Sequence, residues 1–502
     1  MRRTALALVA ALLGAGAVAG AIVFLTGDRD TEVAASVLVN QPGQIEVHNS
    51  PTVARNPRRA EDVVVVHRID RPGFSASLDW SDDGGSTWQP TELALPPGVP
   101  TCAAPLAPGR ACPFGPDAAF GPDGTLYVLY VNLEGQGNVP TNLWLATSTD
   151  GGRTLSEPVR VAGELTFQPR LAVGDDGTVH VTWVQVDAVG LFRFVGPARV
   201  VAVRSTDRGQ TFSEPATVSD AERERVGAAS PVVGGDGDLV VLYEDFKGDR
   251  RDFENLEGPP AEEPFALVVT RSDDGGRSFS AGVELESDVV ATRRFLVFLP
   301  EFPSLAAGSG QTLYVAWADG RNGDEDVFLR RSDDGGGTWT DAVRVNDNPV
   351  GDGTDQYLPK AAVAPDGRVD VLFYDRRRDP ENVGTDAFLA TSDDGGSSFE
   401  NLRVSSTSFD SRIGPTLGEQ YGTDLGARLG LVAGSGASLA AWTDTRMGSE
   451  ATGRQDVLGA VIDQPASTPL LARPPVVAGL LVAGILALGG WWATTRRAAG
   501  AP

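Results

Sequence analysis

SDDGGGTW, residues 332–339, occurs in near-copies along the chain and is the strongest indication of its fold. The shared pattern is Ser-x-Asp-x-Gly-x-Thr/Ser-aromatic, and only Leu155 breaks the aromatic position. Successive copies start 57 to 67 residues apart, and self-similarity at a nearly fixed period is typical of a repeat architecture. The six copies begin at Ser81, Ser148, Ser205, Ser272, Ser332 and Ser392.

Each octapeptide has the composition of a hairpin turn. An Asp side chain in a turn can accept hydrogen bonds from backbone N–H groups two residues further on, and Gly takes positive φ angles at no steric cost. We expect the final Trp or Phe to pack back between strands and fix the turn. The pattern therefore predicts a structural role for the octapeptides and no chemistry.

Alternating strands surround each octapeptide. Two strands joined by a Gly/Asp turn precede it, as in AAVAPDGRVDVLF (361–373), and Asp-Gly between β-rich runs is a strong hairpin signal. A third strand such as DVFLRRS (326–332) leads into the octapeptide, and a fourth such as AVRVN (342–346) follows it. Four antiparallel strands per unit predict a propeller blade.

The chain contains seven such units but six octapeptides. The last unit ends with DVLGAVI (456–462) and has no octapeptide after it. SVLVN (36–40) aligns with AVRVN (342–346), so we expect it to be the outer strand of the last blade, paired with 456–462. The sequence thus predicts an all-β, seven-bladed β-propeller over residues 36–463, closed by an N-terminal strand that removes exposed sheet edges.

The octapeptides resemble the Asp-box (BNR) repeats of sialidase-like proteins over nearly the whole of residues 36–463. The resemblance implies a propeller, a superfold that carries hydrolases, assembly factors and receptors alike. A sialidase clamps a carboxylate with three arginines and uses a Tyr–Glu nucleophile pair with an Asp acid/base. Tyr421 in EQYGTDLG and Glu301 in PEFPSLA are the candidates for that pair, whereas the family's Arg-Ile-Pro motif has no match.

Three consecutive units place Asp and Arg after their second strand, in WADGR (317–321), FYDRRR (373–378) and WTDTR (442–446). Three guanidinium groups near one axis can bind a carboxylate or phosphate in bidentate fashion. The alternative is a set of structural Asp–Arg pairs between blades, which recurrence at one repeat position favours. The candidate ligand-binding residues are Asp319, Arg321, Asp375, Arg376, Asp444 and Arg446.

The net charge of −25 argues against a nucleic-acid partner, because so acidic a surface repels phosphate backbones. No cofactor is predicted. Residues 319–327 and 346–355 offer the oxygen ligands that Ca²⁺ prefers, but their spacing does not match the EF-hand, so we expect solvated acidic loops. His48, His67 and His180 are assigned one to a blade and form no zinc motif, so no metal site is predicted.

Two apolar segments flank the predicted propeller. Residues 1–27, with two arginines before an uncharged apolar run, predict a signal peptide or an uncleaved signal anchor. Residues 476–493 are apolar, end in two tryptophans and precede two arginines, which predicts a transmembrane helix with a cytoplasmic tail, 494–502. Residues 464–475 form a short stalk, and the propeller is then extracellular on a single-pass protein of the cell membrane.

Cys102 and Cys112 are the two cysteines of the chain. The loop between them holds two prolines and a glycine, and a short loop of this kind predicts a disulfide in an oxidising compartment. Two unpaired thiols are the alternative.

These features predict a membrane-anchored extracellular propeller that binds a glycan or a surface protein through the face opposite the octapeptides. Exo-sialidase-type glycoside hydrolysis is the alternative function, and we expect it to be absent.

Overall fold

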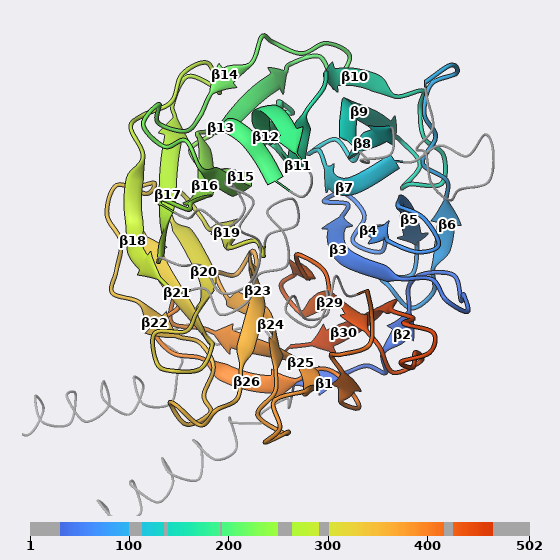
Figure 1. Ribbon diagram of the computed structural model, residues 1–502, viewed down its shortest axis with the longest axis vertical. Coiled ribbons are helices and arrows are strands. Elements are labelled where there is room, and N and C mark those ends of the chain that lie inside the picture. The colour runs from blue at the N-terminus through green and yellow to red at the C-terminus, as the bar shows by residue number, and fades with distance from the viewer. Residues whose placement is uncertain are drawn as a thin grey trace, which may run out of the picture. The chain divides into compact units, whose positions relative to one another are not determined.

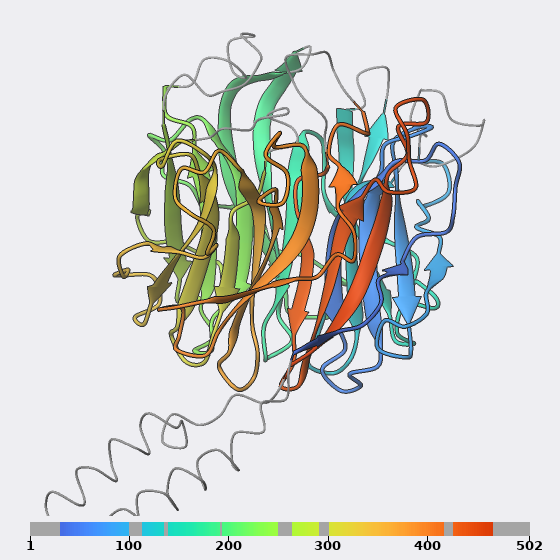
Figure 2. The ribbon, with the colours of Figure 1, turned by 90° about the horizontal axis from the view of Figure 1, so that it is seen from below.

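The computed structural model describes residues 31–99, 113–134, 139–190, 193–248, 264–290, 301–415 and 425–464. One compact unit spans Val33–Asp463. In this unit seven antiparallel sheets surround a common axis (Figure 1), and their strands run roughly along that axis in the side view (Figure 2). The predicted all-β, seven-bladed propeller of four-stranded blades is confirmed.

Each blade is a meander whose first strand is the innermost. From the axis outward, the strands are β3 (His48–Arg55), β4 (Val63–Ile69), β5 (Ser75–Ser81) and β6 (Gln89–Thr91) in blade 1; β7 (Pro113–Phe120), β8 (Leu126–Glu134), β9 (Val139–Ser148) and β10 (Val159–Ala162) in blade 2; β11 (Thr166–Val173), β12 (Val179–Gly190), β13 (Arg193–Ser205) and β14 (Ala216–Thr217) in blade 3; β15 (Val226–Val233), β16 (Leu239–Asp245), β17 (Phe265–Ser272) and β18 (Val283–Val289) in blade 4; β19 (Ser304–Ala307), β20 (Leu313–Asp319), β21 (Asp326–Ser332) and β22 (Val343–Arg344) in blade 5; β23 (Gln356–Val363), β24 (Val369–Asp375), β25 (Gly384–Ser392) and β26 (Glu400–Arg403) in blade 6; and β28 (Gly430–Ala433), β29 (Ala437–Asp444), β30 (Asp456–Asp463) and β2 (Val37–Leu38) in blade 7. Two further short strands, β1 (Glu32–Val33) and β27 (Phe409–Asp410), pair with β30 and β25.

The second strand of a blade is apolar on both faces because each blade is packed between two others. All seven residues of β16 and all seven of β24 are buried. Apolar side chains of adjacent blades form the core between them, and blades 7 and 1 are joined in the same way, with Val63 and Val65 packed against Leu439 and Val457. Burial of these side chains is the main force that holds the ring together.

The six octapeptides form one recurring turn after the third strand. In the first, Ser81 donates to Asp83 Oδ1 (2.6 Å), and the same oxygen accepts the backbone N–H groups of Ser86 and Thr87 (2.9 Å each). The Asp thus binds N–H groups three and four residues further on, and the expected spacing of two residues is wrong. The corresponding aspartates are Asp83, Asp150, Asp207, Asp274, Asp334 and Asp394.

The second glycine of the octapeptide is required by both its conformation and its surroundings. Gly209 has φ +79°, and a Cβ atom built on it would lie 2.5 Å from Leu145 Cδ2 in the preceding blade. At the preceding position a Cβ atom would meet nothing within 4 Å at Gly84 and only side-chain atoms in the other octapeptides, and Arg208 occupies this position at φ +62° where those octapeptides have glycine. The final aromatic packs between its own blade and the one before it, as Trp88 does in the core of blades 7 and 1, which confirms the expected packing between strands.

The N-terminal strand closes the ring as predicted. Val37 pairs with Gly459 and Leu38 with Leu458, so residues from the two ends of the propeller share blade 7. Asn40 then fixes the strand: its Oδ1 accepts the Val457 N–H at 2.7 Å and its Nδ2 donates to Asp456 at 3.1 Å. Asn346 makes the same two bonds, to the Val327 N–H and to Asp326, after the outer strand of blade 5.

Several predictions fall on residues that the structure does not describe. Segments 1–27 and 476–493, the stalk beyond Gln464, the tail 494–502, Cys102 and Cys112 all lie outside the described residues, so these remain predictions. A search of the described ranges for a helix of sufficient length and apolarity to cross a bilayer found none.

We expect Asn40→Ala to lower the free energy of unfolding by about 1–3 kcal/mol, because it leaves the buried Val457 N–H without its acceptor and removes one of the two hydrogen bonds to Asp456 Oδ1, the other coming from Arg454. Urea denaturation of the folded chain measures this loss. Gln41→Ala is the matched control, since that neighbouring side chain is exposed and should change stability by less than about 0.5 kcal/mol. Equal effects of the two variants would contradict the closing role of Asn40.

The octapeptide turns should make the propeller sensitive to acid. Hydrogen bonds from the Thr338 hydroxyl and N–H and from Ser332 lower the pKa of Asp334 to about 2. A carboxyl whose pKa is lower in the folded state stabilises the fold above its unfolded pKa of about 4 and loses that contribution as the pH falls toward 2. Asp334→Asn should therefore be less stable than wild type at pH 7 and approach it near pH 2, measured by thermal denaturation. Asp341→Asn, at an exposed position nearby, should parallel wild type at every pH.

Candidate functional site

A β-bulge recurs at the same place in the innermost strands. The pairing register of the first and second strands shifts there in five blades, and in each a residue with positive φ lies at the shift. Bulges of this kind re-aim the side chain that follows them. The five residues at the shift are Ser50, Gly115, Gln168, Ala228 and Leu358, with φ between 52° and 57°.

In each of these five blades we take the residue two positions beyond the bulge residue. These five residues and their counterparts in blades 5 and 7 are called the axial ring. Gly426, with φ +96°, takes the bulge position in blade 7, and Phe302 precedes the ring residue by two in blade 5. Six of the ring residues lie in innermost strands and the seventh, Arg428, lies two residues before β28; these strands surround the centre in Figure 1. The axial ring consists of Thr52, Asp117, Arg170, Ser230, Ser304, Lys360 and Arg428.

The small and acidic members of the ring bond one blade to the next. Asp117 Oδ2 accepts the Leu171 N–H at 3.0 Å, and Ser304 Oγ accepts the Ala361 N–H at 2.9 Å. Ser230 donates to the Pro303 carbonyl at 3.3 Å. These bonds satisfy backbone groups of the innermost segment in the next blade, so part of the ring has a structural role.

The three long cations of the ring reach further. Arg428 donates through Nε to Thr52 Oγ1 at 2.8 Å and through Nη2 to the Pro116 carbonyl, which joins blade 7 to blades 1 and 2. Arg170 is 8% exposed, and its guanidinium carbon lies 3.9 Å from the ring centroid of Phe302. The Phe302 N–H donates to the Ala427 carbonyl at 3.1 Å. Phe302 therefore contacts both Arg170 and the segment that leads into blade 7.

Lys360 differs from the two arginines. Within the described part of the chain, its ammonium group makes no hydrogen bond or ion pair. Burial lowers the pKa of Lys360, Asp117 opposes that shift, and the positive charges of Arg170 and Arg428 add to it. Burial likewise lowers the pKa of Arg170 to about 10, against the opposing charge of Asp117, and that of Arg428 well below its ordinary value, with Arg170 reinforcing the shift. The cations of the ring therefore repel one another in a partly dehydrated space.

The axial ring carries an excess of positive charge. Its three cations face one carboxylate, Asp117, which leaves two positive charges uncompensated within the ring. Arg68, whose charge also acts on Arg170 and Arg428, is paired with Asp70 at 2.8 Å. A cluster of guanidinium and ammonium groups with too few carboxylates is suited to hold an anion, and guanidinium groups bind carboxylates with particular geometric precision.

The predicted Asp–Arg pairs lie away from this ring. Arg321 binds Asp319 (Nε–Oδ2 2.9 Å) and Glu286 on β18, the outer strand of the preceding blade (3.1 Å). Arg446 binds Asp444 (Nη2–Oδ2 2.6 Å) and donates to Ser406 beyond β26 at 3.0 Å. Each Asp–Arg pair lies within one blade, and the arginine makes a further contact outside that pair. The ligand-binding role of the two pairs stays a prediction.

In blade 6 the position equivalent to Arg321 and Arg446 belongs to Arg377, one residue beyond the predicted Arg376. Arg377 Nε binds Asp375 Oδ2 at 2.7 Å. Arg376 instead donates to Ser411 Oγ at 2.8 Å and to Thr385 Oγ1 at 3.1 Å inside blade 6. Arg377 has the Asp-x-Arg spacing of the other two blades. In the sequence, the run of three arginines at 376–378 makes that spacing hard to recognise.

The remaining predicted residues are distributed as follows. Glu301 directly precedes Phe302 at the entrance to β19 and is partly exposed. Tyr421 lies outside the described residues. His48 and His67 belong to the same blade, with ring centroids 5.0 Å apart, so the assignment of one histidine to each blade is wrong; His48 is the first residue of β3 rather than part of the closing segment.

The two acidic loops meet each other rather than an obvious ion site. Asp324 Oδ2 accepts the Gly353 N–H at 2.8 Å, and Asp355 Oδ1 accepts the Glu325 N–H at 3.2 Å. Among the described residues no group of three or more His, Cys, Asp or Glu side chains could hold a metal ion.

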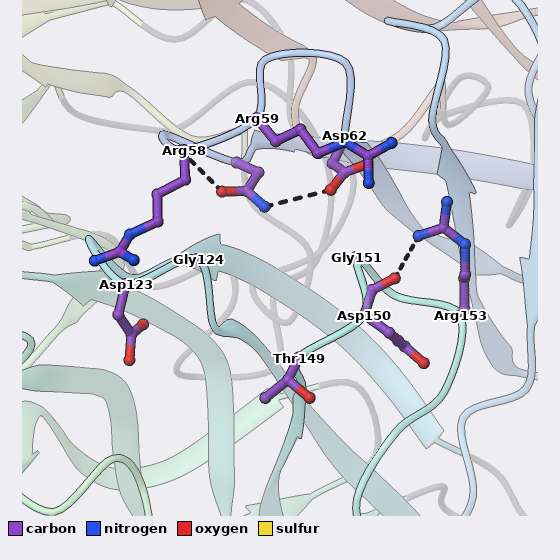
Figure 3. A pocket seen from close by; sticks show the side chains of 10 residues that line it. Arg58, Arg59, Asp62, Asp123, Gly124, Thr149, Asp150, Gly151 and Arg153 are labelled. Atoms are coloured by element: carbon purple, nitrogen blue, oxygen red, sulfur yellow. Dashed lines mark hydrogen bonds and ion pairs between the residues drawn. The ribbon is translucent and has the colours of Figure 1, made fainter.

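A pocket of about 470 Å³ lies on the octapeptide face, between blades 1 and 2 (Figure 3). Arg59 is 3.6 Å from Asp62, and Arg58 Nε donates to the Pro122 carbonyl at 3.0 Å. Three arginines face three aspartates there, so this pocket lacks the charge excess of the axial ring. Its lining residues are Asn56, Arg58, Arg59, Asp62, Asp123, Gly124, Thr149, Asp150, Gly151 and Arg153.

Sequence analysis missed the axial ring, although the chain carries a signal for it. The tripeptides around the bulge read SPT (50–52), GPD (115–117), QPR (168–170), FPS (302–304) and LPK (358–360), with alanine in place of proline in blades 4 and 7. Proline in an innermost strand is informative, because it cannot donate to a ladder and is confined to edges and bulges.

Comparison with known proteins adds the following. No protein-family model matches the sequence, and no curated protein sequence matches it. Among solved structures, a Dyadobacter fermentans DSM 18053 protein of unknown function has 14% identity and a TM-score of 0.49, covering 87% of this chain and 100% of its own. The Hadza microbial sialidase Hz136 has 19% identity and a TM-score of 0.41, covering 65% and 63%. A Penicillium chrysogenum alpha-L-arabinanase complexed with arabinobiose has 16% identity and a TM-score of 0.41, covering 69% and 92%.

If the ring is an anion site rather than a structural cluster, removing a cation should stabilise the empty protein. We expect Lys360→Met, which keeps the length of the side chain, to raise the free energy of unfolding by about 1 kcal/mol, because like charges and burial disfavour the ammonium. Ser304→Ala in the same ring should lower it by about 1 kcal/mol, because the Ala361 N–H loses its acceptor. Urea denaturation of both variants checks the pair, and a loss of stability in Lys360→Met equal to that in Ser304→Ala would assign Lys360 a structural role.

Proposed function

We propose that this protein is a membrane-anchored extracellular propeller that binds a glycan through an acidic sugar held at the axial ring. The observation that carries the proposal is the charge of the ring, in which Arg170, Lys360 and Arg428 face the single carboxylate of Asp117. The anchor and the extracellular position rest on the predicted segments 1–27 and 476–493.

The repulsion within the ring supports an anionic ligand. Burial and neighbouring charges lower the pKa values of all three cations, so the empty ring holds them at a cost in free energy. A bound carboxylate would replace that repulsion with attraction in a space of low dielectric, where charge-assisted hydrogen bonds are strong.

The charge of the whole chain narrows the choice of ligand. The chain carries a net charge of −25, so a polyanion lying across its surface would be repelled, whereas one acid group entering the axis would meet the positive ring. A glycan that ends in a single carboxylated sugar has this distribution of charge. A flat protein surface does not have this distribution of charge. The ring takes one side chain from each blade, so its positive charge is gathered around a single axis.

The exo-sialidase alternative needs an acid and an activated nucleophile in addition to the cations. In the described part of the chain, Asp117 is the carboxylate of the ring, and its Oδ2 accepts the Leu171 N–H. The proposal is therefore binding without cleavage. Hydrolysis of a fluorogenic sialoside by the folded chain, lost in Tyr421→Phe, would overturn this part of the proposal.

Calorimetric titration of the full-length chain in non-ionic detergent with an acidic oligosaccharide tests the site. We expect Arg428→Gln to weaken binding by about tenfold or more, the usual worth of a hydrogen bond to a charged group, and added salt to weaken it further. The neutral sugar without the carboxylate should not bind.

Arg446→Gln is the matched control, because that guanidinium is bound to Asp444 and Ser406. Unchanged affinity in Arg446→Gln with loss in Arg428→Gln supports the axial ring. The opposite result would transfer the site to the predicted Asp–Arg pairs, and binding of an acidic protein but of no glycan would refute the ligand class.

A further inference from the structure

The turn between the first two strands of blade 1 is longer than its counterparts. Seven residues, 56–62, connect β3 to β4, whereas five residues, such as 121–125 in blade 2, connect the corresponding strands of blades 2 to 6. The longer turn reads NPRRAED, and its own hydrogen bonds fix its shape: the Asn56 N–H donates to the Asp62 carbonyl and the Asp62 N–H to the Arg59 carbonyl, each at 2.9 Å. It forms one wall of the pocket of about 470 Å³ on the octapeptide face, opposite the octapeptide of blade 2 (Figure 3). We call this pocket, with the lining residues given above, the rim pocket.

Asp62 is the buried carboxylate of the rim pocket. It is 5% exposed, yet its Oδ1 accepts no hydrogen bond from the residues that the structure describes. Arg59 Nη1 lies 3.6 Å from that oxygen, which is too far for a hydrogen bond. The other oxygen, Oδ2, accepts from Asn56 Nδ2 at 3.4 Å. A buried carboxylate oxygen without a donor carries a cost of desolvation, which a ligand that donates a hydrogen bond would offset.

Two other charged side chains of the rim pocket are bound within the octapeptide face. Asp150 Oδ1 accepts the Thr154 N–H at 2.9 Å, as part of the recurring turn. Arg153 Nη2 donates to Asp82 Oδ2 at 2.7 Å. A ligand would therefore compete with existing bonds at these two residues, whereas it would meet no such competition at Asp62 Oδ1.

The turn of blade 1 determines which ligand the rim pocket suits. Arg58 and Arg59 are exposed, and their guanidinium groups only donate hydrogen bonds, whereas the Asp62 carboxylate only accepts them. A ligand that meets both must offer donors and acceptors close together, and a hydroxyl group does each with one oxygen. The lining holds three arginines and three aspartates, a balance of charge that favours an uncharged ligand over an anion or a cation.

We propose that the rim pocket is a binding site for an uncharged sugar, which it recognises through neighbouring hydroxyl groups. One hydroxyl would donate to Asp62 Oδ1, and the next would accept from Arg58 or Arg59. The pocket volume lies within the range of small-molecule sites, about 300–1,000 Å³. This site shares no residue with the axial ring and does not depend on the function proposed above.

Gly151 leaves room beside the carboxylate. A Cβ atom on this residue would lie 3.3 Å from both Cγ and Oδ2 of Asp62. Arg208 occupies the same octapeptide position in blade 3, at φ +62°, so the turn accepts a side chain there. Because asparagine tolerates positive φ, Gly151→Asn should keep the turn and fill part of the rim pocket.

Saturation-transfer NMR of the full-length chain with the methyl glycosides of glucose, galactose and mannose tests the site, in a polyoxyethylene detergent whose head group carries no sugar. We expect at least one glycoside to bind and Asp62→Asn to weaken its binding by about tenfold or more, the usual effect of losing a hydrogen bond to a charged group. Gly151→Asn should weaken binding by exclusion of the sugar. The fully O-methylated glycoside keeps its oxygen acceptors but has no O–H donor, so it should not bind.

Arg331→Gln is the matched control, because Arg331 precedes another octapeptide and binds Asp333 outside the rim pocket. It should leave the affinity for the glycoside unchanged. Thermal denaturation of each variant checks its fold, and the variants at two different residues keep the test decisive if one of them unfolds.

The outcomes separate this inference from the proposed function. No binding of any of the three glycosides, or equal binding of the O-methylated form, would overturn the rim pocket as a sugar site. Loss of glycoside binding in Arg428→Gln but not in Asp62→Asn would move the sugar to the axial ring and would also overturn it. Failure of the acidic oligosaccharide to bind, with glycoside binding that depends on Asp62, would overturn the proposed function alone.

Discussion

The β-bulge of the innermost strands is the constraint on which the centre of this protein depends. Without it, a first strand would continue its ladder with the second, and its side chains would alternate between the two neighbouring blades. The bulge inserts a residue with positive φ, such as Gln168 or Leu358, and re-aims the residue two positions further on. Repetition of this irregularity around the axis brings charges together that lie up to 311 residues apart in sequence, from Asp117 to Arg428.

The outer parts of the blades solve a different problem, which is to fix the rotation of each blade against the one before it. The octapeptide turn does so with its final aromatic, and the Asp-x-Arg segment does so with a guanidinium that reaches the outer strand of the preceding blade, as Arg321 reaches Glu286. Both devices are built from side chains that make several hydrogen bonds or apolar contacts within the protein. The axial ring is different in kind, because its three cations outnumber the one carboxylate, Asp117, that the ring itself contains.

The sequence predicts the architecture well because the architecture is local and repeated. Each pattern spans only a few residues, as for the octapeptides, the strand pairs and the outer strand 36–40. Repetition along the chain makes these patterns recognisable. The axial ring is not local: Lys360 and Arg170 lie 190 residues apart in the sequence, and only closure of the ring makes them neighbours. Placing the arginine two residues after the aspartate, as in the other two blades, would have given Arg377 instead of Arg376. The Pro-containing tripeptides of the first strands would have indicated the residues at the axis.

Closure by the N-terminal strand also determines the order in which this molecule can be completed. Asn40 and Asp456 are 416 residues apart, so the strand that finishes the last blade is synthesised first and must wait for nearly the whole domain before its partner exists. Contacts of such long sequence separation form slowly, because the entropy of the intervening chain is lost before the contact repays it. Contacts that form this late in folding also raise the barrier to unfolding. A barrier of this kind gives the domain kinetic persistence, which is set by the rate of unfolding rather than by the equilibrium stability.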